Sequence, residues 1–112
     1  MTDVYDLFAT AIRERKQVFC TYHGAPRALC PIILGRGRGV ARALTWQFGG
    51  TNEKGEPMRG QWKCLTLAEV SDVQLRDGPW HAGESHARPQ SCIDDVDLDV
   101  NPDSPYRPRR KL

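Results

Sequence analysis

The first apolar residues of the chain recur with the period of an α-helix. The spacing is i, i+3, i+4, i+7 and i+8, and the residues are Val4, Leu7, Phe8, Ala11 and Ile12. This spacing places them on one face of a helix. Thr2 or Asp3 stands where a side chain caps a helix start, and basic residues after Ile12 oppose the negative end of the helix dipole. The pattern predicts one amphipathic N-terminal helix.

From Gln17 onward the apolar period changes to two, which is typical of strands. Five short strands are predicted, over residues 17–22, 27–34, 40–48, 61–67 and 73–76. Because Pro31 cannot donate a backbone hydrogen bond, we expect it at a sheet edge or at a bulge. The glycine-rich segments 35–39 and 49–60 are expected to form a connection and a long hairpin loop.

One helix followed by five short strands predicts a mainly β (α+β) fold, a small closed or nearly closed five-stranded barrel. Apolar residues alternate with aspartates near the C-terminus, over residues 93–100, and predict an extra edge strand there. The 112 residues have room for one domain. We expect a helix-plus-barrel domain over 1–76, a C-terminal extension over 77–100 whose packing on the barrel stays open, and a disordered basic tail over 101–112.

Charge is distributed unevenly along the chain, although the formal net charge is only +2. Residues 20–63 hold seven bases and two acids, residues 91–103 hold five aspartates and no base, and the last nine residues hold four bases and no acid. The central segment is therefore a candidate anion-facing surface. No apolar run approaches the roughly 18 residues of a membrane span, and no secretory signal is present, so we expect a cytoplasmic protein that does not bind membranes.

The four cysteines, Cys20, Cys30, Cys64 and Cys92, follow no zinc-binding spacing. In a cytosolic protein we interpret them as small buried apolar residues. A zinc site made of His81, His86 and Cys92 with Cys64 or His23 is a weaker alternative. Since no spacing selects a nucleophile with its base, we expect no enzyme activity, no catalytic residues, no metal and no cofactor.

Two segments resemble the WYL domain. They are V-F-C-T-Y-H-G-A-P-R-A-L-C-P-I-I-L, from Val18 to Leu34, and W-K-C-L-T-L-A-E-V, from Trp62 to Val70. Tyr22, Arg27 and Pro31 have family-like spacing, and a polar loop leads into Trp62-Lys63. The likeness covers about residues 3–76 and is closest to short, stand-alone WYL-like proteins of bacteria.

The resemblance implies an SH3-like or Sm-like barrel of five strands behind an N-terminal helix. It also implies a role in transcriptional or defence-associated regulation, in which the domain senses a nucleotide or single-stranded nucleic acid. By this alignment Arg42-Ala43-Leu44 stands at the naming triplet of the family, and Glu69 stands where the family usually carries arginine. No DNA-binding helix-turn-helix precedes the domain, so we do not expect direct repression by this chain alone.

The central arginines and aromatic residues are the candidate ligand-binding residues. They are Tyr22, Arg27, Arg36, Arg38, Arg42, Trp46, Trp62 and Lys63. Arginines neutralise phosphates and aromatic rings stack on bases, so the first hypothesis is a non-enzymatic sensor that binds an anionic ligand in one basic pocket. The alternative is an interaction subunit that docks a larger protein through the barrel edge at Pro31 or through the acidic strand at 94–99. The oligomeric state is left open.

Overall fold

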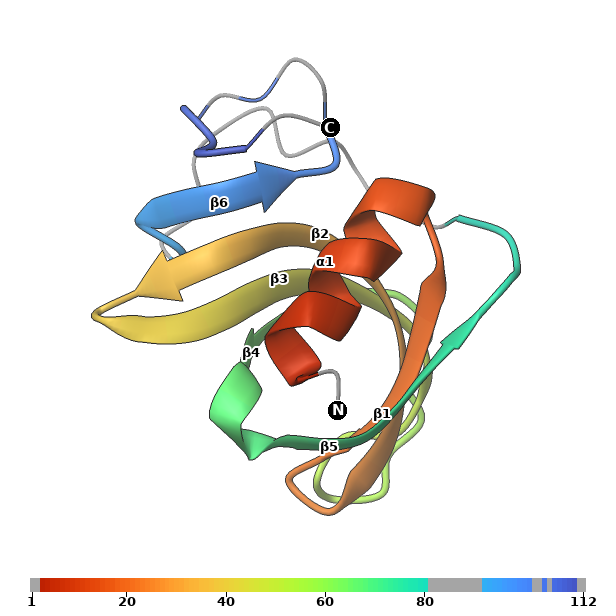
Figure 1. Cartoon of the computed structure of the whole chain (residues 1–112). Coiled ribbons are helices and arrows are strands. Elements are labelled where there is room, and N and C mark those ends of the chain that lie inside the picture. The colour runs from red at the N-terminus through yellow and green to blue at the C-terminus, as the bar shows by residue number, and fades with distance from the viewer. Residues whose placement is uncertain (1–2, 81–91, 102–103, 105, 111–112) are drawn as a thin grey trace.

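The computed structural model describes residues 3–80, 92–101, 104 and 106–110. Within these ranges the elements are α1 (Val4–Glu14), β1 (Gln17–Tyr22), β2 (Ala25–Gly37), β3 (Val40–Gly50), β4 (Gln61–Thr66), η1 (Leu67–Glu69), β5 (Val70–Arg76) and β6 (Asp95–Asp99). The strands form one antiparallel sheet, and this sheet curves around α1 (Figure 1). This arrangement confirms the predicted mainly β class.

The predicted N-terminal helix is present and begins as its cap predicts. The Asp3 side chain accepts a hydrogen bond of 2.8 Å from the Asp6 backbone N–H, and the helix ends at Arg15 in the left-handed conformation. Phe8 and Ile12 are fully buried. They anchor α1 against β1, β2, β5, β6 and η1, so the apolar stripe of the helix closes one side of the core.

Strand β2 organises the sheet because it pairs with three other strands. The order is β4-β3-β2-β1-β5, and β6 adds to β2 beside β1. The first half of β2 pairs with β1, as at Val18 and Leu29, and its second half pairs with β6, as at Leu34 and Leu98. Pro31 lies between the two halves, next to a shift in the β2–β3 register. The bulge expected at Pro31 is therefore confirmed. Among the described strands, Pro31 pairs only with Thr45 of β3, because the β1 ladder stops at Leu29 and the β6 ladder starts at Ile33.

The glycine-rich segment 35–39 is mostly strand, so predicting it as a connection was wrong. Strand β2 continues to Gly37, and Arg38 and Gly39, both with positive φ, form a two-residue turn into β3. Gly35 and Gly37 have another purpose. A Cβ atom at either residue would overlap a backbone carbonyl, that of Asp95 or that of Cys92. These glycines therefore let the C-terminal chain approach β2 closely.

The C-terminal extension packs on the sheet through β6, which confirms the predicted extra strand. Its apolar side chains at Val96 and Leu98 are buried in the same core as those of α1 and β2. Strand β5 begins at Val70, earlier than expected, and Asp72 within it adopts a positive φ. In the part of the chain that the structure describes, no helix is long and apolar enough to cross a membrane.

Two arginines of the C-terminal tail are bound to β6. The backbone N–H groups of Arg109 and Arg110 donate to the carbonyl oxygens of Val96 and Asp97 at 3.0 and 2.9 Å. The expected disorder of the tail therefore does not describe these two residues. The domain boundaries at residues 76 and 100 remain predictions.

Candidate functional site

The structure distributes the candidate ligand-binding residues over separate places. Tyr22 and Arg27 lie where β1 turns into β2, Arg36 and Arg38 lie at the β2–β3 turn, Arg42 and Trp46 lie on β3, and Trp62 and Lys63 lie on β4. Successive side chains of a strand point to opposite faces. Trp62 and Lys63 therefore cannot face the same ligand across a flat sheet, and the single basic pocket expected from the sequence is not formed.

Arg27 is buried and already paired within the chain. Its side chain is 2% exposed. Nη2 and Nε donate to the Tyr22 carbonyl at 3.1 and 3.4 Å, and Nη1 donates to Gln47 Oε1 at 3.2 Å. A carboxylate oxygen of Glu53 lies 3.6 Å from Nη2. Buried charges require such partners, so Arg27 holds this end of the sheet together and is not free for a ligand.

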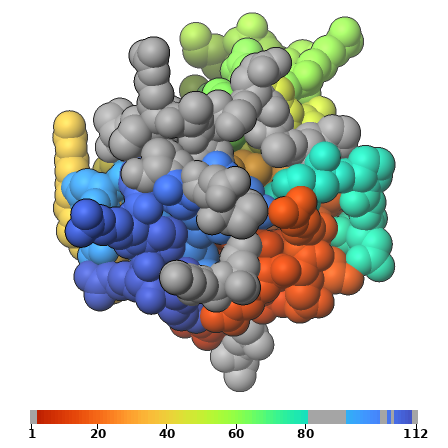
Figure 2. Space-filling view, turned by 90° about the horizontal axis from the view of Figure 1, so that it is seen from above, coloured from red at the N-terminus to blue at the C-terminus, as the bar shows by residue number. Residues whose placement is uncertain are grey.

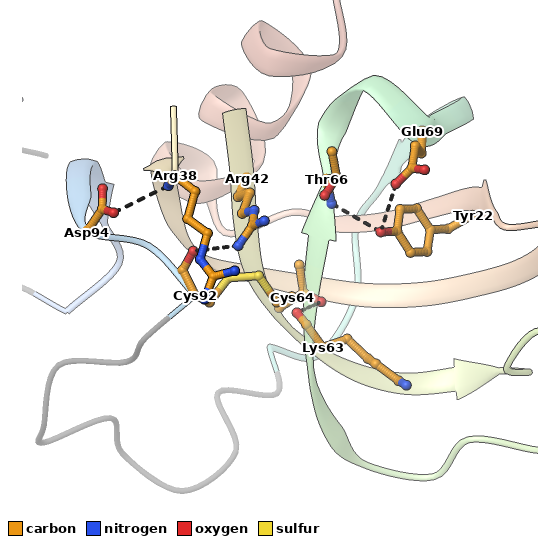
Figure 3. The surroundings of a disulfide bond; sticks show 10 residues. Tyr22, Arg38, Arg42, Lys63, Cys64, Thr66, Glu69, Cys92 and Asp94 are labelled. Atoms are coloured by element: carbon orange, nitrogen blue, oxygen red, sulfur yellow. Dashed lines mark hydrogen bonds between the residues drawn. A yellow bond between two sulfur atoms is a disulfide. The ribbon is translucent and has the colours of Figure 1, made fainter. Parts of the chain in front are cut away.

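Tyr22 connects the end of β1 with the end of β4 and with η1. Its hydroxyl accepts a hydrogen bond from the Thr66 backbone N–H at 3.2 Å and donates to Glu69 at 3.5 Å (Figure 3). One ring face stacks on His23, with the ring centroids 4.0 Å apart, and the Arg27 guanidinium lies 5.4 Å from the ring centroid. Glu69 thus binds Tyr22 and, at 3.2 Å, His23. The position at which the resembling family carries arginine is therefore occupied by an internal contact.

Lys63 lies on the face of β4 opposite to Trp62 and pairs with Thr45 of β3. The pKa of the exposed Glu53 carboxyl is lowered, first by a hydrogen bond from its own backbone N–H and then by the charges of Lys63 and Arg27. The negative charge of Glu53 therefore partly offsets the positive charges of Lys63 and Arg27. Among the described residues, this end of the sheet holds two bases whose charge Glu53 partly neutralises.

Trp46 and Trp62 form a pair on the outer face of β3 and β4. They are directly opposite each other in the β3–β4 register, and their rings meet edge to face with centroids 5.2 Å apart. Both are half-buried, so part of each ring is open to solvent. Arg42 shares this face of β3, two residues before Leu44 and four before Trp46. The outer face of β3 and β4 therefore combines aromatic surface with one guanidinium.

A disulfide borders this face. Cys64 of β4 is bonded to Cys92, which precedes β6, with their Cα atoms 6.0 Å apart (Figure 3). Our interpretation of all four cysteines as small buried apolar residues is correct for Cys20 and Cys30 only, which are buried and lie outside the disulfide. The bond joins residues 28 positions apart, a pairing that spacing alone does not select. It ties the C-terminal extension to β4.

Arg42 lies against this disulfide with few partners. Its Nη1 donates to the Cys92 carbonyl at 3.5 Å, and its buried Nε has no hydrogen-bond partner among the residues that the structure describes. In Figure 3 the side chain of Arg38 also points toward Cys92. Arg38 is exposed at the turn, and its backbone N–H donates to Asp94 at 3.3 Å. Buried unpaired donors are rare in proteins, so Arg42 is a predicted site residue with a buried donor left unused among the described residues.

Arg36 faces a different group of residues. It is exposed on β2, donates a 3.5 Å hydrogen bond to the Gly39 carbonyl, and lines a pocket of about 310 Å³ with Tyr5, Asp95 and Asp97. The tail arginines Arg109 and Arg110 line the same pocket. Sequence reasoning did not find this group, although the contrast between the aspartates of residues 91–103 and the bases of the last nine residues was its signal.

Metal-binding and nucleophilic chemistry find little support in the described ranges. No group of three or more His, Cys, Asp or Glu residues there is arranged to hold a metal ion. His81 and His86 of the zinc alternative lie outside the described residues, and both its cysteine candidates are in the disulfide. Burial raises the pKa of the Cys20 thiol to about 11, so at neutral pH this thiol is protonated and poorly nucleophilic.

Comparisons of the chain with protein-family models, with curated proteins and with solved structures found no match. The site must therefore be interpreted from its own geometry.

Proposed function

We propose that the chain is a non-enzymatic regulatory or sensor module that binds a nucleotide or single-stranded nucleic acid on the outer face of β3 and β4. We also propose that it is a WYL-like protein whose sheet closes into an SH3-like or Sm-like barrel. The sheet order β4-β3-β2-β1-β5, with a helical turn between β4 and β5, supports that architecture.

The pair formed by Trp46 and Trp62 carries this proposal. Aromatic rings on a small barrel bind bases by stacking, at about 1–3 kcal/mol per base, whatever the base identity. The two rings are adjacent, half-buried and on one face, which holds them in place while leaving ring surface for a ligand. The same face carries Arg42, whose guanidinium has a single 3.5 Å hydrogen bond among the described residues.

The revised site is smaller than the one predicted from the sequence. Arg27 and Tyr22 support the fold from inside, and Lys63 points away from the tryptophans. We therefore assign ligand contact to Trp46, Trp62 and Arg42. Arg38 lies farther along the same hairpin, at the turn before β3. Regulation of transcription remains part of the proposal only through the resemblance to the WYL domain. The residues assigned to ligand contact lie on strands, and not on a helix that could enter a DNA groove.

The test is binding of a fluorescein-labelled oligothymidylate of about 15 nucleotides, near the length covered by one small barrel. Fluorescence anisotropy at several salt concentrations gives both affinity and the number of phosphate contacts. We expect Trp62→Leu to weaken binding about tenfold, as the loss of one stacked base requires. Arg42→Gln should lower the slope of log affinity against log salt by about 0.7.

Arg13→Gln is the matched control, because Arg13 is an exposed base at the end of α1, away from β3 and β4. Displacement of the oligonucleotide by a mononucleotide would narrow the ligand to that class. The proposal is wrong if the wild-type protein does not bind at 50 mM salt, or if both variants bind as tightly as the Arg13→Gln control.

A cytoplasmic location remains part of the proposal. Disulfides in that compartment are rare and usually transient, so the bond between Cys64 and Cys92 would be exposed there to cellular reductants. Docking of a protein partner is the second candidate function, and of its two proposed surfaces only the acidic strand is retained, because Pro31 is buried.

A further inference from the structure

Strand β6 holds two consecutive arginines of the tail in the same way. Arg109 donates its backbone N–H to the Val96 carbonyl, and its guanidinium forms two hydrogen bonds to Asp95, at 2.9 and 2.5 Å. Arg110 donates its backbone N–H to the Asp97 carbonyl, and its guanidinium forms two hydrogen bonds to Asp97, both 2.7 Å. Each arginine is thus recognised by its backbone and by its planar fork together.

A bulge in β6 makes this double recognition possible. The register with β2 passes from Leu34 and Leu98 to Gly35 and Val96, which leaves Asp97 as an extra residue. Such a residue is unpaired in the ladder and re-aims its neighbours. Asp97 therefore has both its carbonyl and its carboxylate available for an incoming chain, while β2 fixes the other side of the strand.

Tyr5 of α1 completes the acidic site. Its hydroxyl donates a 2.6 Å hydrogen bond to Asp97 Oδ2, which orients the carboxylate toward Arg110. The pKa of Asp97 is lowered, mainly by the hydrogen bond from Arg110, so the carboxylate is ionised at neutral pH. In Figure 2 the tail, dark blue, lies on the surface between β6 and α1. The pocket of about 310 Å³ at this place has room beside the two arginines.

We propose that β6 and Tyr5 form a docking site for a peptide segment of a partner protein that contains two adjacent arginines, and that the chain's own tail occupies this site until such a peptide replaces it. Charge complementarity supports this occupant: Asp95 and Asp97 each bind one guanidinium fork, a geometry that lysine cannot reproduce.

The tail contact has the properties of an exchangeable occupant. The side chains of Arg109 and Asp95 are 68% and 39% exposed, and those of Arg110 and Asp97 are 42% and 15% exposed. Exposed ion pairs contribute little to stability because water and salt screen them. Since the site uses backbone hydrogen bonds and two forks, and both arginines lie in a bend of the tail, it selects a bent Arg-Arg segment without holding its own tail irreversibly. This proposal is independent of nucleic-acid binding, because it uses a different edge of the molecule.

The test uses the full chain and a fluorescein-labelled peptide with the sequence of residues 104–112. The variant Arg109→Ala/Arg110→Ala empties the site, so it should bind the peptide more tightly than the wild type. A tethered tail has an effective concentration of about 1 mM. If the free peptide binds at about 0.1 mM, the wild type should show an affinity about tenfold weaker than that of the emptied variant.

Further variants test whether the peptide binds to the aspartates of β6. Adding Asp97→Asn or Asp95→Asn to the emptied variant should reduce peptide binding at least about tenfold, since one charge-assisted fork is lost. Adding Glu14→Gln, which removes an exposed carboxylate at the end of α1, should leave binding unchanged. A peptide with both arginines replaced by lysine should bind clearly more weakly. Two aspartate variants are used so that a folding defect in one does not decide the outcome.

Three results would overturn the proposal. One is equal peptide affinity of the wild type and the emptied variant. Another is equal binding of the arginine and lysine peptides. The third is a concentration-dependent dimer of the wild type, measured by light scattering, that disappears in the emptied variant, because the occupant would then be the tail of a second copy.

Discussion

The body of the protein, residues 3–76, and its C-terminal attachment, the described residues from 92 to 110, use arginine in opposite ways. Arg27 in the body is 2% exposed and bonded to a carbonyl and an amide inside the sheet. Arg109 and Arg110 in the attachment pair with aspartates at the surface. Removing a buried partner leaves others unsatisfied, whereas water replaces an exposed one. We therefore expect the contacts of Arg27 in the body to be required for the fold. We expect the contacts of Arg109 and Arg110 in the attachment to be replaceable by those of another ligand.

The largest effect is expected inside the body. Arg27→Leu leaves the Tyr22 carbonyl and Gln47 Oε1 without their donor, at about 1–3 kcal/mol for each buried group. We expect the free energy of unfolding to fall by about 4 kcal/mol, measured by urea denaturation. Arg76→Leu is the matched control. Arg76 is exposed and lies 4.3 Å from the Phe19 ring centroid, so its loss should cost about 1 kcal/mol. Equal effects of the two variants would contradict the comparison.

The next effect concerns the covalent link between the two regions. The bond between Cys64 and Cys92 spans 28 residues, and the loop-entropy model gives about 3.5 kcal/mol for such a loop. Cys64→Ser/Cys92→Ser should lose about this much stability in urea. Amide hydrogen exchange should become faster in β6 than in β1–β3, because the bond anchors the attachment.

Reductant provides the control for this prediction. It should destabilise the wild type and leave the double serine variant unchanged, since Cys20 and Cys30 are not in a disulfide. If reduction instead accelerates exchange equally in β6 and in β1–β3, the attachment is not a separate region and the comparison fails.

Most of the body could be predicted from local pattern. The helix and the strands β1 to β4 follow from apolar periods of 3.6 and 2, and the Asp3 cap from its position before Val4. These features depend on neighbours a few residues away. Local alternation also predicts the strand β6 of the attachment. Its partner could not be predicted in the same way, because β6 pairs with β2 about 60 residues earlier in the chain.

The glycines of the β2–β3 hairpin show why long-range contacts are missed. Gly35 and Gly37 have the composition of a turn, which the sequence pattern favoured. Their actual role is to leave space for the backbone of Asp95 and Cys92. Nothing within the segment distinguishes the two roles, since both require the absence of a side chain.

The candidate site was overestimated for a reason that the sequence itself contained. Adjacent residues such as Trp62 and Lys63 point to opposite faces of a strand, so they could not join one site. The burial of Arg27 was not visible, because its partner Gln47 comes 20 residues later and reaches it only through the β2–β3 pairing. Alternation along β3 does place Trp46 and Arg42 on one face.

The smallest effect is expected from acid acting on the attachment. The pKa of Asp97 is below its ordinary value of 3.8, chiefly because Arg110 donates to the carboxylate. A lowered folded pKa means that the contribution is complete above pH 3.8 and is lost as pH falls through the folded pKa. Asp97→Asn should therefore reduce stability by about 1 kcal/mol at pH 7, and the difference from the wild type should shrink steadily below pH 3.8.

Asp77→Asn is the matched control for the acid prediction, because Asp77 pairs with Lys16 at the surface and its side chain is 88% exposed. Its removal should change stability little at pH 7, since a pair this open to solvent is screened. Urea denaturation of the three proteins at pH 7, 4 and 3 separates the two cases. A difference between Asp97→Asn and wild type that persists unchanged at pH 3 would mean that Asp97 stabilises β6 by packing and not by its charge. The attachment would then resemble the body, and its arginines would no longer be expected to exchange.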